Sequence, residues 1–154
     1  MNQYNIVISN GRIIDPESGL NSIRNLGILN GKIAFISESP IEGEEYIDAS
    51  DQVVCPGFID LHCHPQDAQI FEVQARDGVT TTLELEVGTS DIDAFYSKWE
   101  GKAVVNFGAS IGHIPVRMSV LEDPGVFLPS GDAGRREATD AEINQMKEYK
   151  NLKN

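Results

Sequence analysis

The sequence predicts a mixed α/β protein, with an antiparallel sheet in residues 1–55 and parallel β/α units in residues 56–154. The first part contains two Asn-Gly pairs between apolar runs, Asn10-Gly11 and Asn30-Gly31. Such pairs favour hairpins, because a type I′ turn needs positive φ at both central residues. After Pro56-Gly57, apolar β-rich runs alternate with segments of helical period, which is typical of strands joined by crossover helices.

The expected strands of the first part are short and flank these two turns. We predict strands at residues 4–9, 12–14, 26–29 and 32–36. Two hairpins so close together indicate an antiparallel sheet, and we assign the turns themselves no functional role.

The second part is expected to open with a mostly buried strand and then to alternate between helices and strands. The predicted elements are a strand at 57–62, a helix at 68–77, a strand at 79–87, a helix with a capping box at 90–93, a strand at 102–108, a long surface loop at 118–138 and a helix with a capping box at 139–142. The helix after residue 90 carries an apolar stripe that is expected to pack on the sheet. Its members are Ile92, Phe95, Tyr96 and Trp99.

The composition is that of a globular, strongly acidic protein. The 154 residues include 12 Lys plus Arg and 24 Asp plus Glu, and the net charge of −12 argues against duplex DNA, RNA or an anionic membrane as a partner. No apolar run reaches the roughly 18 residues that a membrane span needs, and the N-terminus lacks the basic and apolar regions of a secretory signal. Cys55 and Cys63 are too few for a disulfide framework. We therefore expect a cytoplasmic protein with reduced thiols.

The segment PGFIDLHCHP, residues 56–65, carries the clearest chemical signal. Residues i and i+2 of a strand point to the same side, so His62 and His64 share a face and Cys63 faces the other way. Two imidazoles at the carboxyl end of a buried strand can bind one metal ion, although they can also be incidental polar residues at a strand end. We predict that His62 and His64 are metal ligands, and that Cys63 and Cys55 are small packing residues.

The next strand contributes two carboxylates on one face, Glu84 and Glu86. Buried carboxylates are rare unless they are paired or bind metal, whereas an edge strand with a solvated acidic face would need neither. Glu86 lies nearer the carboxyl end of the strand and is the predicted third metal ligand. Glu84 lies deeper in the strand, where we expect it to contact a metal ligand or the substrate.

Three further residues are candidates for supporting roles. Asp60 shares the face of the histidines, where it either accepts a hydrogen bond from a ligand imidazole or acts as a structural carboxylate. His113 follows the third strand in a Gly-rich segment, where it either reaches substrate or a metal ligand, or is an ordinary surface residue. Arg117 either clamps a substrate carboxylate or makes an ordinary loop salt bridge.

Four segments together resemble the amidohydrolase superfamily, and within it the D-aminoacylase and N-acyl-D-glutamate deacylase branch. They are NGRIIDPESG, VVCPGFIDLHCHPQD, GVTTTLELEVG and NFGASIGHIPVR, and the resemblance extends to about Thr139. It implies a partial (β/α)₈ TIM-type barrel, of which residues 56–154 supply the first three β/α units. It also implies that residues 1–55 form the N-terminal part of a small composite β-sandwich. By this resemblance His62 and His64 bind one or two divalent metals, with zinc the expected ion.

The sequence departs from the family pattern in two ways. Many D-aminoacylases have a cysteine ligand just after the second strand, where this sequence has Val87 beside Glu86. The family also takes two histidines and an aspartate from later strands, so the catalytic base remains unknown. Because a complete barrel needs about 250 residues, we expect this chain to be the N-terminal piece of a larger protein.

The resemblance implies metal-assisted hydrolysis of an amide C–N bond, with an N-acyl-D-amino acid such as N-acyl-D-glutamate as the small-molecule substrate. Two alternatives stay open. One is a catalytically inactive remnant of the fold, and the other is a cyclic-amide hydrolase of the dihydroorotase or hydantoinase type, or a deaminase. The 154-residue chain alone is expected to be inactive and to exist as a homo-oligomer or beside a complementing C-terminal partner.

Overall fold

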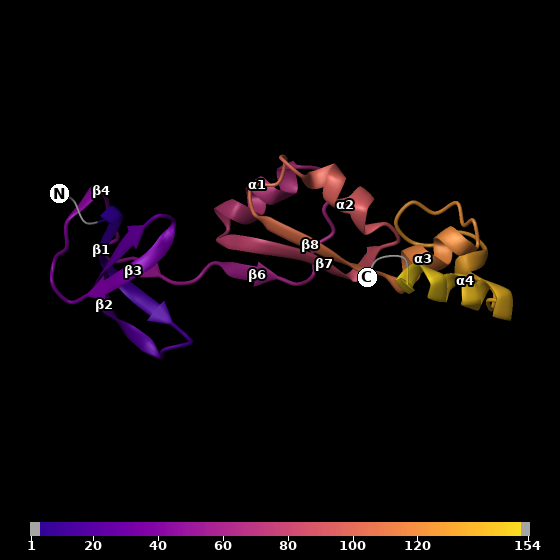
Figure 1. Cartoon of the computed structure of the whole chain (residues 1–154), viewed down its shortest axis with the longest axis horizontal. Helices are drawn as coiled ribbons and strands as arrows, with labels where there is room; N and C mark the ends of the chain where they lie inside the picture. Colours follow the sequence, from indigo (N-terminus) through magenta and orange to yellow (C-terminus); the bar gives the residue numbers. More distant parts are fainter. Residues whose placement is uncertain (1–3, 152–154) are drawn as a thin grey trace. The chain divides into compact units, whose positions relative to one another are not determined.

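The computed structural model describes residues 4–151, with side chains described for residues 4–149. The chain divides into two compact units, residues 1–56 and 57–154 (Figure 1). This division lies one residue from the boundary expected between residues 55 and 56. Within the described residues, none of the helices has the length and apolar character needed to cross a membrane.

The N-terminal unit is a single sheet of five strands. They are β1 (Tyr4–Asp15), β2 (Leu20–Leu29), β3 (Lys32–Ser37), β4 (Gly43–Asp48) and β5 (Val53–Val54). The strand order is β3-β2-β1-β4, with β5 also paired to β1. The β1–β2 and β2–β3 pairs are antiparallel as predicted, but β4 and β5 pair with β1 in parallel. The sheet is therefore mixed, with β4 and β5 pairing with successive parts of β1.

One of the two predicted hairpin turns is correct and the other is wrong. Asn30 and Gly31 connect β2 to β3 with φ of 53° and 72°, as a type I′ turn requires. Asn10-Gly11 instead lies inside β1, where the register with β2 shifts between Ile8 and Gly11. Asn10 has a φ of 62°, and its backbone N–H donates to the Asn25 side chain over 3.2 Å. The positive φ that the pair favours is used here for a β-bulge.

The C-terminal unit is built on a three-stranded parallel sheet in the order β6-β7-β8. Its strands are β6 (Phe58–Asp60), β7 (Val79–Thr89) and β8 (Asn106–Ile111), with helices α1 (Gln69–Arg76) and α2 (Ile92–Trp99) as the connections. Both helices lie on the same face of the sheet (Figure 1). Beyond β8 come α3 (His113–Val120), a short 3₁₀ turn η1 (Asp132–Gly134) and α4 (Asp140–Asn151). Helix α3 was not predicted, and it takes the place of the start of the expected loop at 118–138.

An aromatic core joins the helices to the sheet. Phe71 of α1 is fully buried, and its ring centroid lies 5.2 Å from that of Trp99 in α2 and 6.2 Å from that of Phe107 in β8. The Asp91 side chain caps α2 by accepting from the Ala94 N–H over 3.0 Å, one residue later than the capping box predicted. This packing fixes α1 and α2 against the sheet.

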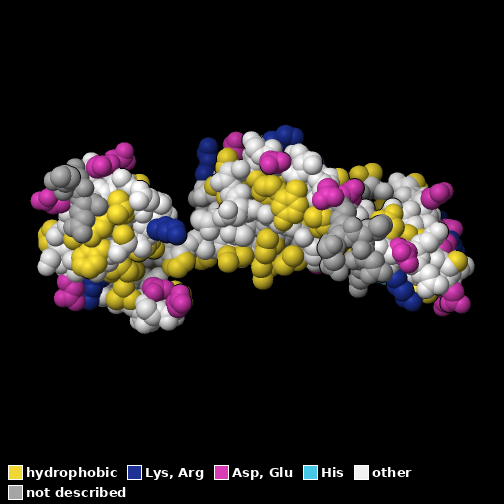
Figure 2. Space-filling view, in the orientation of Figure 1, with side chains coloured by type: hydrophobic (Ala, Val, Ile, Leu, Met, Phe, Trp, Pro, Cys, Tyr) yellow, Lys and Arg dark blue, Asp and Glu magenta, His cyan; other side chains and the backbone are white. Residues whose placement is uncertain are grey.

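The first strand of this unit is more exposed than predicted. Phe58 and Ile59 are each 62% exposed, and Leu61 is also exposed. Strand β6 is an edge strand of its sheet, and α1 and α2 cover only one face, so burial on both sides is not achieved. Figure 2 shows hydrophobic side chains gathered along this part of the unit.

Candidate metal centre

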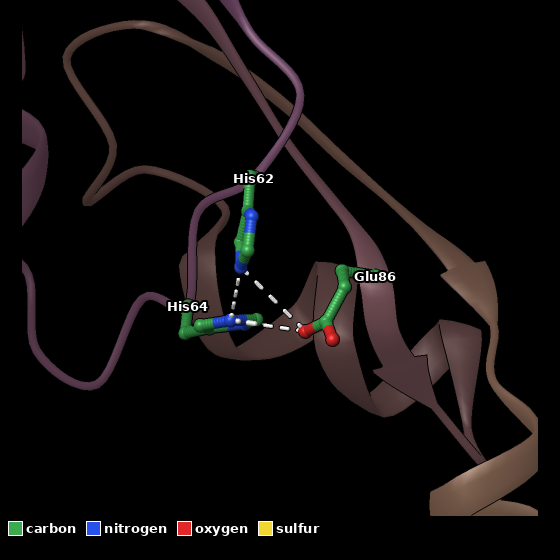
Figure 3. A group of neighbouring side chains, drawn as sticks. All are labelled: His62, His64 and Glu86. Atoms are coloured by element: carbon green, nitrogen blue, oxygen red, sulfur yellow. Dashed lines mark hydrogen bonds and ion pairs between the residues drawn. The ribbon is translucent and has the colours of Figure 1, made fainter.

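Three side chains converge just beyond the end of β6 and near the end of β7. The Nε2 atoms of His62 and His64 lie 3.1 Å apart. The Oε2 atom of Glu86 lies 3.6 Å from Nε2 of His62 and 3.4 Å from Nε2 of His64. All three side chains point toward a common centre (Figure 3). These are the three residues that the sequence predicts as metal ligands.

The spacing and chemistry of these atoms fit a single divalent ion. Zinc binds imidazole nitrogens and carboxylate oxygens at about 2.0–2.2 Å, so two ligand atoms in a tetrahedral site lie roughly 3.3 Å apart. The three distances here, 3.1, 3.4 and 3.6 Å, surround that value. Two imidazoles and one carboxylate are also a donor set found in catalytic zinc sites. The residues present therefore fit a metal ion.

The backbone after β6 is held so that both imidazoles face β7. The Asp60 carboxylate accepts a hydrogen bond from the His62 backbone N–H over 3.0 Å, and the Cys63 N–H donates to the Leu83 carbonyl over 3.3 Å. Cys63 is buried, whereas His62 is exposed and His64 is half-buried. The alternation that the sequence suggested thus persists past the end of β6, although these residues no longer belong to a regular strand.

Glu84 lies behind the three side chains and orients His64. Its Oε2 atom lies 2.7 Å from Nδ1 of His64, and its Oε1 atom accepts from the Gly88 backbone N–H over 3.1 Å. Glu84 is only 6% exposed and belongs to the central strand of the sheet, which rules out the edge strand with a solvated acidic face. In the tautomer that carries its proton on Nδ1, His64 donates to Glu84, and its Nε2 lone pair faces the other two side chains of the cluster.

The candidate centre is open on one side. The side chains of His62 and Glu86 are 67% and 56% exposed, whereas that of His64 is 25% exposed. An ion held by three protein ligands keeps at least one coordination position for water or substrate. The accessible side of the cluster is where such a molecule would approach.

Of the two roles predicted for Asp60, the structure shows that of a structural carboxylate. Besides holding the His62 backbone, its Oδ2 atom accepts from Nε2 of Gln74 over 3.0 Å, and the same amide nitrogen also donates to Thr82. The carboxylate thus ties β6 to α1 and β7. Its hydrogen bonds to the described residues are with backbone and amide groups, and the bond to a ligand imidazole, which was the alternative role, is not formed.

His113 and Arg117 lie on α3, apart from the three converging side chains. Both line a cavity of about 710 Å³, together with Ile143 and Met146 of α4. The Arg117 guanidinium donates through Nε to the Ala133 carbonyl over 2.7 Å and through Nη2 to the Arg136 carbonyl. It therefore fastens the following loop through backbone carbonyls in place of the loop salt bridge that was one of its two predicted roles, and the substrate clamp stays a prediction.

Two residues of that loop were missed by the sequence analysis. Asp123 accepts hydrogen bonds from four backbone N–H groups, and Phe127 places its ring centroid 5.0 Å from that of His64. Partial desolvation acts to raise the pKa of Asp123, but the four donors outweigh it and lower the pKa below its usual range. The Asp123-Pro124-Gly125 run is a turn signal in the sequence, whereas no local pattern indicates the contact between Phe127 and His64.

The known proteins that the chain resembles include several enzymes of one superfamily, the amidohydrolases. No protein-family model matches the sequence. A dihydroorotase of Streptococcus pneumoniae serotype 4 is 37% identical over 94 residues, which are 55% of this chain and 22% of that protein. An adenine deaminase of Listeria monocytogenes serotype 4b is 42% identical over 83 residues, 51% of this chain and 14% of that protein.

Among solved structures, the chain resembles the N-acyl-D-glutamate deacylase of Bordetella bronchiseptica, crystallised with zinc and a phosphonate inhibitor. The TM-score is 0.73 and the identity 23%, over 95% of this chain and 35% of the deacylase. The chain thus spans about a third or less of the length of these relatives. The predicted resemblance is confirmed: the sequence matches lie in the amidohydrolase superfamily, and the fold matches its D-aminoacylase and N-acyl-D-glutamate deacylase branch.

Proposed function

We propose that this chain, which resembles the amidohydrolases in sequence and in fold, forms the first metal-binding part of an enzyme that hydrolyses amide C–N bonds. The substrate class that we propose is the N-acyl-D-amino acids, such as N-acyl-D-glutamate. The observation that carries the proposal is the convergence of His62, His64 and Glu86 within 4.8 Å of one another. A divalent ion, with zinc as our choice, fits this donor set.

Each residue of the cluster has a specific part in this proposal. His62 and His64 would hold the ion through Nε2, and Glu86 through a carboxylate oxygen. Glu84 keeps the proton of His64 on Nδ1 and so keeps Nε2 free for the ion. When bound, the ion would activate water and polarise the substrate carbonyl. We assign no general base among residues 4–149, so the proton transfer to the leaving amine is left to groups outside the cluster.

The fold supports the proposal through the order and direction of its strands. The parallel order β6-β7-β8, with a helix after each of the first two strands, is what the first three β/α units of a (β/α)₈ barrel require. His62 and His64 lie just beyond the carboxyl end of β6, and Glu86 lies near the carboxyl end of β7, the edge at which such barrels hold their active sites. We also propose that the N-terminal sheet is part of a composite sandwich.

A second candidate is favoured by the sequence matches. The relatives at 37% and 42% identity are a dihydroorotase and an adenine deaminase, whereas the deacylase is matched in fold at 23% identity. A cyclic-amide hydrolase or a deaminase would use the same kind of metal centre, but water would attack a ring carbon of the substrate instead of the carbonyl carbon of an acyl group. An inactive remnant of the fold is the third possibility, and it differs from the others in lacking turnover.

The test compares three substrate classes with one enzyme. The protein translated from the complete open reading frame that encodes this chain is loaded with zinc and assayed with N-acetyl-D-glutamate, dihydroorotate and adenine. We expect hydrolysis of N-acetyl-D-glutamate that is lost in His62→Ala and retained in Glu72→Gln, a change at an exposed position of α1. Turnover of dihydroorotate or adenine alone would establish the second candidate, and a zinc-loaded protein inactive on all three would establish the remnant.

A further inference from the structure

We propose that Phe127 is a positioning residue of the metal centre, and that the segment 122–136, here called the Asp123 loop, is a preassembled wall beside His64. The proposal rests on the proposed function, because it gives His64 the role of a metal ligand. It extends that function to a part of the chain that carries none of the ligands. The predicted surface loop thereby becomes part of the site.

The Asp123 loop is fixed by its own hydrogen bonds. Oδ1 of Asp123 accepts from the N–H groups of Gly125 and Ser130, over 3.0 and 2.9 Å. Oδ2 accepts from the N–H groups of Gly131 and Ala133, each over 2.9 Å. One of these donors precedes Phe127 in the chain and three follow it. A single carboxylate therefore fixes the backbone on both sides of Phe127.

A second anchor attaches the loop to α3. Arg117 donates to the Ala133 and Arg136 carbonyl oxygens. Because α3 follows directly from β8, the loop is tied to the same sheet that carries Glu84 and Glu86. The tip of the loop, residues 126–128, is thus held in place relative to the metal ligands. These three residues do not belong to the buried core.

At the tip, the Phe127 ring makes a specific contact. Its centroid lies 5.0 Å from that of the His64 imidazole, with an interplanar angle of 67°. Among the ring pairs formed by the described side chains, Phe127 pairs with His64 alone. Its neighbours Val126 and Leu128 are exposed, Val126 completely, so the tip is not buried in a core. The contact with His64 is therefore the clearest reason for an aromatic residue at this position.

This contact complements the one that Glu84 makes. Glu84 fixes the His64 ring at Nδ1, and Phe127 packs edge to face against the same ring. Together they restrict the imidazole to the orientation in which Nε2 faces Nε2 of His62 and Oε2 of Glu86.

The test measures cobalt(II) binding to the 154-residue chain, following the visible absorption that reports the geometry around the ion. The wild-type chain is expected to bind cobalt at a site lost in the His62→Ala, His64→Ala double variant. Phe127→Ala should weaken binding by about 3- to 10-fold, the range expected for loss of one aromatic pair, and should alter the absorption spectrum. Phe127→Tyr should restore both, and Glu72→Gln, at an exposed position of α1 outside the Asp123 loop, should behave as wild type.

The outcomes separate this proposal from the proposed function. Wild-type affinity and spectrum in Phe127→Ala would overturn the role of Phe127 and leave the metal centre standing. Weaker binding in Phe127→Ala that Phe127→Tyr does not restore, accompanied by a lower midpoint of thermal unfolding, would assign Phe127 a purely structural role and also overturn it. A wild-type chain whose cobalt binding is unaffected by the double histidine variant would remove the metal centre and, with it, both proposals.

Discussion

The carboxylate of Glu84, which is almost fully buried, and the half-buried imidazole of His64 face each other across 2.7 Å, from Oε2 to Nδ1. The two residues are 20 positions apart, on β7 and in the segment after β6. Their hydrogen bond joins the two chain segments that supply the candidate metal ligands. The geometry of the centre therefore depends on a residue that does not contact the proposed ion.

Replacing Glu84 tests this dependence. Glu84→Gln keeps the size of the side chain but removes the charge that holds the proton on Nδ1 of His64, so we expect zinc affinity to fall by about 10- to 100-fold. Calorimetric titration of the chain with zinc measures the change. Glu72→Gln, at an exposed position of α1, is the control and should leave the affinity unchanged. Equal affinities in Glu84→Gln and wild type would show that Glu84 does not orient His64.

Gly112 is expected to be required for the close approach of the ends of β7 and β8. A Cβ atom at this position would lie 1.7 Å from the Val87 carbonyl oxygen, which only a backbone shift can relieve. We expect Gly112→Ala to lower the free energy of unfolding by about 1–3 kcal/mol or more. Urea unfolding checks the prediction, with Gly134→Ala as the control, because a Cβ atom there meets only ordinary contacts of 3.5 Å or longer.

Helix α4 is expected to lose a stabilising contact in acid. Hydrogen bonds from Arg136, and then from the Thr139 backbone N–H, lower the pKa of Glu142 from 4.5 to about 2. A carboxylate whose pKa falls on folding stabilises the folded state above its unfolded pKa, and this contribution disappears as the pH falls from about 4.5 to about 2.

The measurement is the midpoint of thermal unfolding as a function of pH. Glu142→Gln should unfold at a lower temperature than wild type near neutral pH, and the difference should shrink as the pH falls from about 4.5 toward about 2, where Glu142 is half protonated in the folded state and fully protonated in the unfolded state. Glu148→Gln, at an exposed position of the same helix, should match wild type throughout. A difference between Glu142→Gln and wild type that stays constant from neutral to acid pH would contradict this account.

The zinc-loaded chain of residues 1–154 is not expected to hydrolyse N-acetyl-D-glutamate at an enzymatic rate by itself. Its described residues bring together two imidazoles and one carboxylate, whereas catalysis also needs a base within hydrogen-bond reach of the reacting water. The assay uses the His62→Ala, His64→Ala double variant as its control. Turnover of about one per second or faster that disappears in the control would mean that copies of the chain complete the site together.

The convergence of the three candidate ligands could be predicted because it follows from local rules. Side chains alternate in an extended chain, so His62 and His64 were expected on one side. The carboxyl ends of parallel strands lie at the same edge of the sheet, so Glu86 was expected beside them. The structure brings these residues together as expected. It also places Glu84 deeper, on a ligand imidazole, because the buried central strand leaves its carboxylate no solvent to face.

The features that the sequence analysis missed depend on contacts between distant segments. Asn10-Gly11 carries the same local signal as Asn30-Gly31, but pairing along β1 turns it into a bulge. Arg117 has the chemistry of a carboxylate clamp, yet its partners are backbone carbonyls of a loop that only the folded chain brings near. Phe127 lies far from His64 in the sequence, and no periodicity connects the two. Exposure of β6 likewise depends on which strands and helices cover it.

The most direct test of the central claim is the X-ray absorption spectrum of the chain loaded with one equivalent of zinc. If His62, His64 and Glu86 bind the ion, the spectrum should show only nitrogen and oxygen ligands at about 2.0–2.2 Å, with the outer-shell scattering of two imidazoles. The imidazole scattering should be lost in the His62→Ala, His64→Ala double variant. A sulfur ligand at about 2.3 Å, or a spectrum that the double variant leaves unchanged, would contradict the assignment of the metal centre to these three residues.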